Sequence, residues 1–520
     1  MSTKSLLKST GIISAATATS RVLGFVRDIL IANFFGTGLS IQAFLVAFRL
    51  PNLLRHMVAE GASSSAFVPV LSEYLVTKDR DEYWRLANGL LSLMLVTLIV
   101  IVAIGITAAP FIVRVIAPGF VTEPAQFELA VNLTRTIFPY ILLIGLAAYA
   151  MAILNSLKHF TVPAFSPALL NLSIIAAIVI FKRDVGVENL AFAVLVGGVL
   201  QLIMQIPVLY KKGMRLKFPP VLYHPAAGRV VKLLLPRILG SAVYQLNVLI
   251  DTILSSLHWI VGAGGIAALY YSNRLIQLPT AIFGISIATA ALPTLSAHFT
   301  RKNTKGFKET LNFSLKSLFM IMVPAAVGIM VMGSQIIRIL FERGEFTQFS
   351  TMITNQALFY YAFGLFSYAG IKILVFSFYS MQDTRTPVKT ACIALVINVV
   401  LNLILMWPLK IGGLALATSI AGITNFAMLF FLLRKKIGSF GEKEIAVFLA
   451  KILAASSLMG LILHIVTIRF NAILLKKDTF FNAGYLFLSI AGGIFIYFFV
   501  LYLLRAEELG KFLKWVLKRR

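Results

Sequence analysis

Several ionisable side chains lie inside apolar stretches of this chain that are long enough to cross a membrane. They are Arg21, Arg27 and Asp28 in the first stretch, Arg49, Arg55, His56 and Glu60 in the second, and Arg274 in a later one. A charged group inside a membrane span costs about 2.5 to 3.5 kcal/mol even on the lenient insertion scale, so the clustering needs a reason. Because the planar guanidinium group binds phosphate oxygens in pairs, these residue types indicate a site for an anion, in particular a phosphate ester.

The arginines in these stretches outnumber the acidic side chains by about three charges. A local interpretation accounts for part of this excess. Arg27 can pair with Asp28, and Arg55 with Glu60, while Arg49 is close enough to a span end to reach toward water. The excess that remains favours an anionic ligand. An exporter of cationic drugs would be expected to carry unpaired carboxylates in its cleft instead.

A second group of side chains offers oxygen atoms rather than positive charge. The group consists of Asp251, Asn398, Asn402 and Thr418, each within an apolar stretch. The two asparagines are four residues apart and therefore lie on one face of a helix. Hard oxygen donors suit a sodium ion, and Asp251 can alternatively carry a proton. The competing interpretation is that Asp251 pairs with Arg237 or another arginine and that the asparagines form hydrogen bonds between helices.

The elements that must position these residues are membrane-spanning helices. Of the 520 residues 59% are hydrophobic and only 13% charged, which excludes water-soluble domains because too little polar surface is available to cover them. The apolar blocks are about twenty residues long, as a helix needs to cross the hydrocarbon region. We predict an all-α polytopic membrane protein with about 14 transmembrane helices. The predicted spans are 10–35, 40–66, 87–111, 130–156, 163–181, 189–210, 234–257, 266–297, 311–335, 353–379, 387–407, 412–433, 446–468 and 481–504.

The distribution of basic residues indicates how the chain is oriented. With an even number of spans both termini lie on one side of the membrane, and about two thirds of the Lys and Arg residues fall on that side. The positive-inside rule therefore places both termini in the cytoplasm. The net charge of +27 reflects this topology, and we expect no nucleic-acid partner. A single cysteine, Cys392, excludes a disulfide framework and a cysteine-based metal site.

An internal repeat is visible at a constant spacing along the sequence. We call this spacing, which separates Pro69 from Pro293, the repeat offset. The same offset relates Ser156 to Ser380, Pro163 to Pro387, and the lysine pair 211–212 to the pair 435–436. An offset that contains six spans leaves both copies in the same orientation, so the repeats are parallel. We predict two six-helix lobes, 1–217 and 225–436, around a central cleft, then two helices in 445–505 and a basic cytoplasmic tail in 506–520. Two lobes that rock around a cleft are the design of a secondary transporter.

Longer motifs in both lobes are similar to those of one protein family. They are residues 20–28 (SRVLGFVRD), 50–55 (LPNLLR), 59–61 (AEG), 66–69 (AFVP) and 271–275 (YSNRL), with Pro279 and Pro293 following. In these motifs the chain resembles the MurJ (MviN) family of lipid II flippases, in the multidrug/oligosaccharidyl-lipid/polysaccharide exporter superfamily. The resemblance extends in order and spacing to about residue 436, and the last two helices match in number and position.

The resemblance implies a function. A member of this family is a multi-pass protein of the bacterial inner (cytoplasmic) membrane that flips lipid II, the undecaprenyl-pyrophosphate disaccharide-pentapeptide, to the periplasmic leaflet by alternating access, for peptidoglycan and cell wall biogenesis. The last helix pair is then expected to form a groove for the lipid tail. Lipid II and membrane lipids are the expected partners, and association with other cell-wall synthesis proteins is left open. The energy source is left open among membrane potential, sodium and protons.

The resemblance also implies which residues bind the pyrophosphate. The family's cleft arginines correspond to Arg21, Arg27, Arg55 and Arg274, and its companion polar positions to Ser20, Asp28 and Asn52. The chain departs from some relatives at two positions. His56 stands where they have a second arginine, and Gln42 where they have an aspartate.

Other classes of protein compete with this interpretation to different degrees. An exporter of another polyprenyl-pyrophosphate-linked oligosaccharide, or a cation-coupled drug exporter of the same fold, would share the repeat and the helices. A scaffold that binds partners through basic loops would not need charged residues inside its spans. We find no P-loop, metalloprotease helix or nucleophile elbow, and we expect neither an enzyme nor a cofactor beyond a coupled sodium ion or proton.

Overall fold

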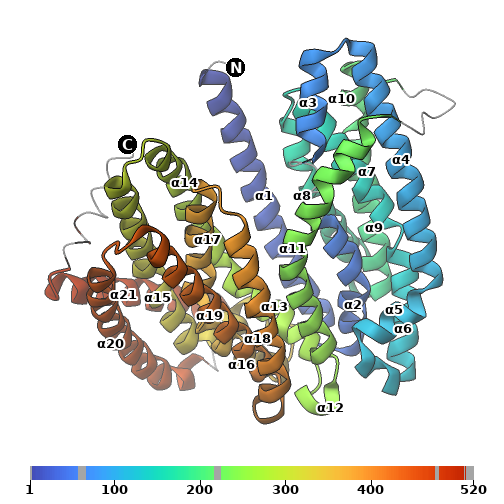
Figure 1. Cartoon of the computed structure of the whole chain (residues 1–520). Helices are drawn as coiled ribbons and strands as arrows, with labels where there is room; N and C mark the ends of the chain where they lie inside the picture. Colours follow the sequence, from blue (N-terminus) through green and yellow to red (C-terminus); the bar gives the residue numbers. More distant parts are fainter. Residues whose placement is uncertain are drawn as a thin grey trace. The chain divides into compact units, whose positions relative to one another are not determined.

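The computed structural model describes residues 3–56, 66–184, 186–215, 224–474 and 479–506, together with residues 508 and 510. These residues form helices joined by short turns and contain no β-strand (Figure 1). The chain divides into two compact units, Met1–Leu257 and His258–Arg520. The all-helical class predicted from composition is confirmed.

The first unit contains eleven α-helices and two short 3-10 segments among its described residues. They are α1 (Thr3–Phe35), α2 (Leu39–Arg55), α3 (Val68–Thr77), α4 (Arg80–Thr107), α5 (Ala109–Ile116), η2 (Pro118–Thr122), α6 (Pro124–Ile137), α7 (Tyr140–Ser156), α8 (Thr161–Phe181), η3 (Lys182–Asp184), α9 (Val187–Ile203), α10 (Ile206–Lys211) and α11 (Ala227–Ser255). The helix α1 packs along α8, which packs on α9, while α7 lies against α4 and α9.

The second unit is organised around the long helix α15. Its elements are α12 (His258–Val261), α13 (Gly265–Pro279), the π-helical η4 (Thr280–Gly284), α14 (Ile285–Thr300), α15 (Thr304–Phe341), α16 (Gln348–Ala362), α17 (Leu365–Ser380), α18 (Arg385–Leu409), α19 (Ile411–Ile437), α20 (Glu442–Leu474) and α21 (Thr479–Leu503). The helix α15 contacts α14, α16, α17, α20 and α21, and α18 packs along α19.

Most of the predicted spans are apolar helices in the structure. Among the described residues, ten helical segments are long and apolar enough to cross a membrane, or eleven if the bent pair α16–α17 is one span. The other predicted spans, 10–35, 40–66 and 234–257, fall on α1, α2 and α11. The helices α1 and α11 carry ionisable residues, and α2 ends just before residues 57–65, which lie outside the described residues. A multi-pass membrane protein is confirmed.

Helices of the two units begin at positions that are related by the repeat offset. The pairs are α4 and α15 (residues 80 and 304), α6 and α16 (124 and 348), α8 and α18 (161 and 385), and α9 and α19 (187 and 411). One pair also shares its N-cap chemistry. The Asp79 side chain accepts a hydrogen bond from the Glu82 backbone N–H, and the Asn303 side chain accepts one from Gly306. These matches support an internal duplication.

The last two predicted spans are α20 and α21, which pack on α15. The Tyr497 hydroxyl of α21 donates to the backbone oxygen of Met320 in α15 at 2.8 Å. Within α15 the Lys316 Nζ lies 3.0 Å from Glu508 Oε1 and 3.5 Å from Glu444 Oε2. The helix pair is therefore held to the second unit by packing, a buried hydrogen bond and ion pairs.

The helix α11 packs against α2, α4 and α5 of the first unit, although the sequence repeat assigns it to the lobe 225–436. At the C-terminal end of α11, Ser256 meets Gly119 of η2, whose backbone N–H donates to the Ser256 Oγ at 3.1 Å. A Cβ atom at Gly119 would lie 1.8 Å from the Ser256 carbonyl oxygen. The boundary between the two compact units therefore lies after α11, because α11 packs on the first unit. It does not coincide with the boundary of the sequence repeat, which lies before α11.

We expect Gly119→Ala to lower the stability of the protein, because its Cβ forces the end of α11 away from η2. Overpacking of this kind costs about 1 to 3 kcal/mol. Gly228→Ala, near the other end of α11, is a matched control, since a Cβ there meets nothing within 4 Å. Thermal unfolding of the purified variants in detergent measures both. Equal midpoints for the two variants would contradict the close contact at Gly119.

Candidate functional site

Arg27 is held in a buried polar cluster between α1 and α8. Its Nε and Nη2 donate to Asp28 Oδ1 at 3.0 and 2.6 Å, and its Nη1 donates to Asn171 Oδ1 at 2.9 Å. The Asn171 Nδ2 in turn donates to the Ser20 backbone oxygen at 3.0 Å. Arg27 is 8% exposed and Asp28 2%. Hydrogen bonds beyond the pair itself offset part of the cost of burying two charges, and Arg27 makes one to Asn171.

The helix geometry of α1 explains this arrangement. Ser20, Gly24 and Arg27 follow one another at spacings of four and three residues, so they lie along one face, which packs on α8. A Cβ atom at Gly24 would lie 3.5 Å from the Asn171 amide nitrogen. The glycine therefore leaves room for the asparagine close to the α1 backbone.

Within this cluster the structure brings together three predicted site residues and one that the sequence reasoning missed. Ser20, Arg27 and Asp28 meet, and the local pairing of Arg27 with Asp28, considered from the sequence as an alternative, is present. Asn171 was missed. The available signal was an asparagine inside the otherwise apolar span 163–181, which in a membrane helix indicates a polar contact.

Arg55 and Asn52 interact at the end of α2. The Arg55 Nε donates to Asn52 Oδ1 at 3.1 Å, and the Arg55 Nη2 lies 3.0 Å from the His56 Nε2. Arg55 is half-buried, and Glu60, its predicted partner, lies outside the described residues. Arg21 is exposed on α1. The hydrogen bonds described for Arg55 thus go to an amide oxygen and to an imidazole nitrogen.

Arg274 occupies a comparable environment in α13 of the second unit. Its Nη2 donates to the Tyr270 hydroxyl at 3.2 Å and its Nη1 to Gln277 Oε1 at 3.4 Å. The guanidinium carbon lies 5.0 Å from the centroid of the Tyr270 ring, within the range of a cation–π interaction. These contacts are made to uncharged side chains and orient a half-buried guanidinium group.

Three of the predicted cation ligands form a hydrogen-bonded chain between α18 and α19. The Asn402 Nδ2 donates to Asn398 Oδ1 at 2.9 Å, and the Asn398 Nδ2 donates to the Thr418 Oγ1 at 3.1 Å. Both asparagines are fully buried. The interhelical hydrogen bonds considered from the sequence are therefore present.

The fourth predicted cation ligand, Asp251, belongs to α11 of the first unit. It is 8% exposed, and the Asn247 Nδ2 donates to its Oδ2 at 3.5 Å. In the part of the chain that the structure describes, no group of three or more His, Cys, Asp or Glu side chains could hold a metal ion.

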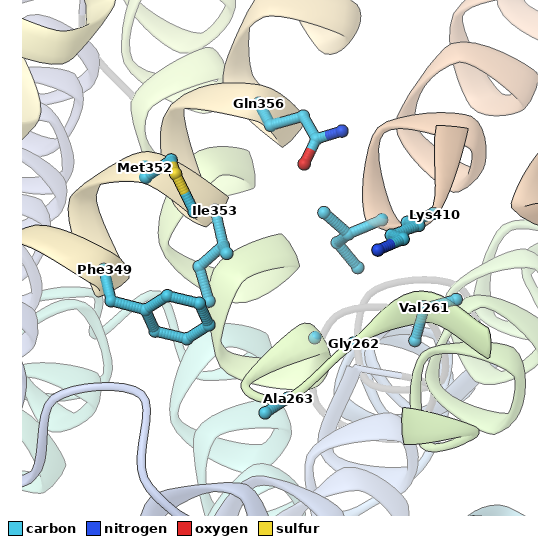
Figure 2. A pocket seen from close by; sticks show the side chains of 10 residues that line it. Val261, Gly262, Ala263, Phe349, Met352, Ile353, Gln356 and Lys410 are labelled. Atoms are coloured by element: carbon cyan, nitrogen blue, oxygen red, sulfur yellow. The ribbon is translucent and has the colours of Figure 1, made fainter. Parts of the chain in front are cut away.

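A cavity of about 300 Å³ opens in the second unit where α12, α13, α16 and α19 begin or end. Figure 2 shows Lys410 and Gln356 extending toward it among apolar side chains such as Phe349 and Met352. The Gln356 Nε2 donates to the Leu409 backbone oxygen at 3.2 Å. The sequence analysis did not anticipate this cavity, because its lining comes from three separate segments of mostly apolar residues.

The family model described as lipid II flippase MurJ matches residues 31–483. The chain belongs to the lipid II flippase MurJ family. The resemblance inferred from the motifs is confirmed, and the matched region includes α2, α8, α13 and the cavity.

Named relatives of the MurJ family match over most of their length. A probable lipid II flippase MurJ of Vibrio cholerae is 38% identical over 440 residues, which is 82% of each chain. One of Buchnera aphidicola is 36% identical over 466 residues, covering 89% of this chain and 90% of the relative. The lipid II flippase MurJ of Burkholderia cenocepacia is 36% identical over 430 residues, covering 82% and 83%.

Solved structures agree with the MurJ assignment. A lipid II flippase MurJ in an inward closed conformation has a TM-score of 0.81 at 27% identity and covers 96% of this chain and 99% of its own. A multidrug resistance MATE family transporter in an inward-facing conformation has a TM-score of 0.66 at 18% identity, covering 81% and 96%. The second likeness shows that the fold is shared with MATE transporters.

Proposed function

We infer that this chain is a lipid II flippase, a transporter and not an enzyme, which moves the lipid-linked peptidoglycan precursor across the membrane by alternating access. The observation that carries this conclusion is the match of the MurJ family model to residues 31–483. The chemistry of the described arginines supports it, because a pyrophosphate-linked lipid needs cationic, bidentate partners inside the membrane.

We propose the finer architecture on the basis of the repeat. Fourteen spans form two six-helix lobes, 1–217 and 225–436, followed by the helices of 445–505 and the tail 506–520, and the helix starts related by the repeat offset support the two copies. The excess of basic loops on one side supports cytoplasmic termini and the bacterial inner membrane. Rocking of such lobes would expose a central site alternately to the cytoplasm and the periplasm.

The proposed pyrophosphate site divides its arginines into two kinds. Arg55 and Arg274 make their described hydrogen bonds to uncharged side chains, and together with the exposed Arg21 they would offer guanidinium N–H groups to the pyrophosphate. Arg27 is already paired with Asp28, so its positive charge is balanced within the cluster. We propose that Ser20, Asp28 and Asn52 position these guanidinium groups, and that α20 and α21 guide the undecaprenyl tail. Shared use of lipid II would bring the flippase close to other cell-wall synthesis proteins.

Complementation tests the proposed function. A bacterium depleted of its own lipid II flippase is supplied with this chain, and lipid II in the inner leaflet is measured. We expect the precursor to be cleared and growth to resume. A chain that inserts into the membrane but leaves the precursor in the inner leaflet would contradict lipid II as the substrate.

We further propose that Asp251 takes part in cation coupling, with Asn398, Asn402 and Thr418 as the companion oxygen donors. The chemistry of these side chains supports this role, because carboxylate, amide and hydroxyl oxygens are hard donors that suit a sodium ion. We expect Asp251→Ala to abolish any sodium dependence of flipping, measured in proteoliposomes in which sodium is exchanged for potassium at constant ionic strength. Asp251→Asn, which keeps an oxygen donor without the charge, is the matched control and should weaken the dependence less. Unchanged sodium dependence in Asp251→Ala would exclude this role.

A further inference from the structure

The turns that join α7 to α8 and α17 to α18 are related by the repeat offset and have the same backbone conformation. Lys158 and Gln382 both have φ of 60°. In the first turn the His159 N–H donates to the Leu154 oxygen at 2.8 Å, and in the second the Asp383 N–H donates to the Phe378 oxygen at 3.0 Å. His159 and Asp383 are therefore structurally equivalent positions of the repeat.

In the second unit the Asp383 carboxylate connects two helices. Its Oδ2 lies 2.7 Å from the Lys436 Nζ at the end of α19. In the first turn of α18, the Thr386 N–H donates to the Asp383 Oδ1 at 3.0 Å and the Thr386 hydroxyl donates to the Oδ2 at 2.9 Å. The hydrogen bond from Lys436, and after it the backbone hydrogen bond from Thr386, lower the pKa of Asp383 to about 2. The negative charge at this position is strongly stabilised.

In the first unit the equivalent positions hold two basic residues, His159 and Lys212. The His159 Nε2 is buried and has no hydrogen-bond partner among the described residues, and none of the acidic side chains described there pairs with Lys212. The first turn of α8 has no side-chain cap. Lys212 is the C-cap residue of α10, and α10 packs on α7, which ends just before the turn that carries His159. Burial, and after it the Lys212 ammonium, lower the pKa of His159.

We propose that His159 and Lys212 bind the phosphate of an anionic phospholipid, which supplies the negative charge that the Asp383 carboxylate supplies in the second unit. A phosphodiester carries the single negative charge and the acceptor oxygens that this place requires. The surroundings of the two residues indicate a lipid as the source of this phosphate. Lys158 and Lys211 lie beside the site at the ends of two membrane-spanning segments, and basic residues at that level attract anionic headgroups.

The substitution His159→Asp tests the proposal, because it supplies the missing carboxylate within the chain. The thermal unfolding midpoint of the purified full-length protein is measured in detergent alone and with added phosphatidylglycerol, phosphatidylcholine or inorganic phosphate. For the native chain we expect phosphatidylglycerol to raise the midpoint by about 2 °C or more, and phosphatidylcholine not to. For His159→Asp we expect a higher midpoint without lipid and loss of the phosphatidylglycerol effect.

Two further variants keep the test decisive. Lys212→Gln should lose the phosphatidylglycerol effect without gaining stability in detergent, and it remains informative if His159→Asp fails to fold. Asp383→Asn, at the equivalent position of the second unit, should lower the midpoint and retain the effect. An undiminished phosphatidylglycerol effect in His159→Asp or Lys212→Gln would overturn the site. An effect of inorganic phosphate that both variants lose would support the phosphate site and overturn its assignment to a lipid.

Discussion

Arg27→Ala is expected to abolish complementation and also to lower the stability of the protein. Removal of the guanidinium group leaves the Asp28 carboxylate, only 2% exposed, without its ion-pair partner. Breaking a buried pair by removing one partner costs about 3 to 5 kcal/mol. The same change deletes one of the arginines of the proposed pyrophosphate site. Complementation and thermal unfolding of the purified variant measure the two effects.

A double variant separates the structural effect from the functional one. Arg27→Met combined with Asp28→Asn removes both charges while it keeps most of the side-chain volume. We expect it to unfold close to the temperature of the native chain and still to fail in complementation. If the double variant restored growth, the Arg27 cluster would serve only to join α1 to α8 and would not bind substrate.

Arg274→Ala is expected to abolish or strongly reduce flipping with little change in stability. The described partners of Arg274 are the Tyr270 and Gln277 side chains, which are uncharged, so its removal leaves no buried opposite charge among them. A hydrogen bond to a charged group contributes about 1.5 to 3 kcal/mol, which corresponds to a rate loss of about ten-fold to more than a hundred-fold. Lipid II flipping in proteoliposomes measures the rate.

Arg274→Lys is the control for this prediction, because it keeps the charge and loses the bidentate geometry. We expect an intermediate rate, since an ammonium group attracts the pyrophosphate as a point charge but cannot form paired hydrogen bonds. An Arg274→Ala protein that folds and flips lipid II at the native rate would remove Arg274 from the site.

Arg27 and Arg274 show which features of the site could be predicted from sequence patterns and which could not. The intramembrane charges were recognisable because an ionisable group is rare in an apolar span, and the pairing of Arg27 with Asp28 was foreseeable because the two are adjacent. The role of Asn171 could not be predicted from the sequence. Its hydrogen bond with Arg27 joins residues 144 positions apart, and an apolar span does not reveal which of its faces meets another helix.

The sequence by itself determined the helical membrane class, most of the spans and the family, because these follow from composition, from the length of apolar blocks and from contiguous motifs. It also revealed the repeat. Only the tertiary structure decided that α11 packs with the first unit, that Asn171 completes the Arg27 cluster, and that His159 and Asp383 occupy equivalent turns. In a membrane helix nearly every face is apolar, so periodicity does not distinguish the face that meets lipid from the face that meets protein. Packing between distant segments makes that choice.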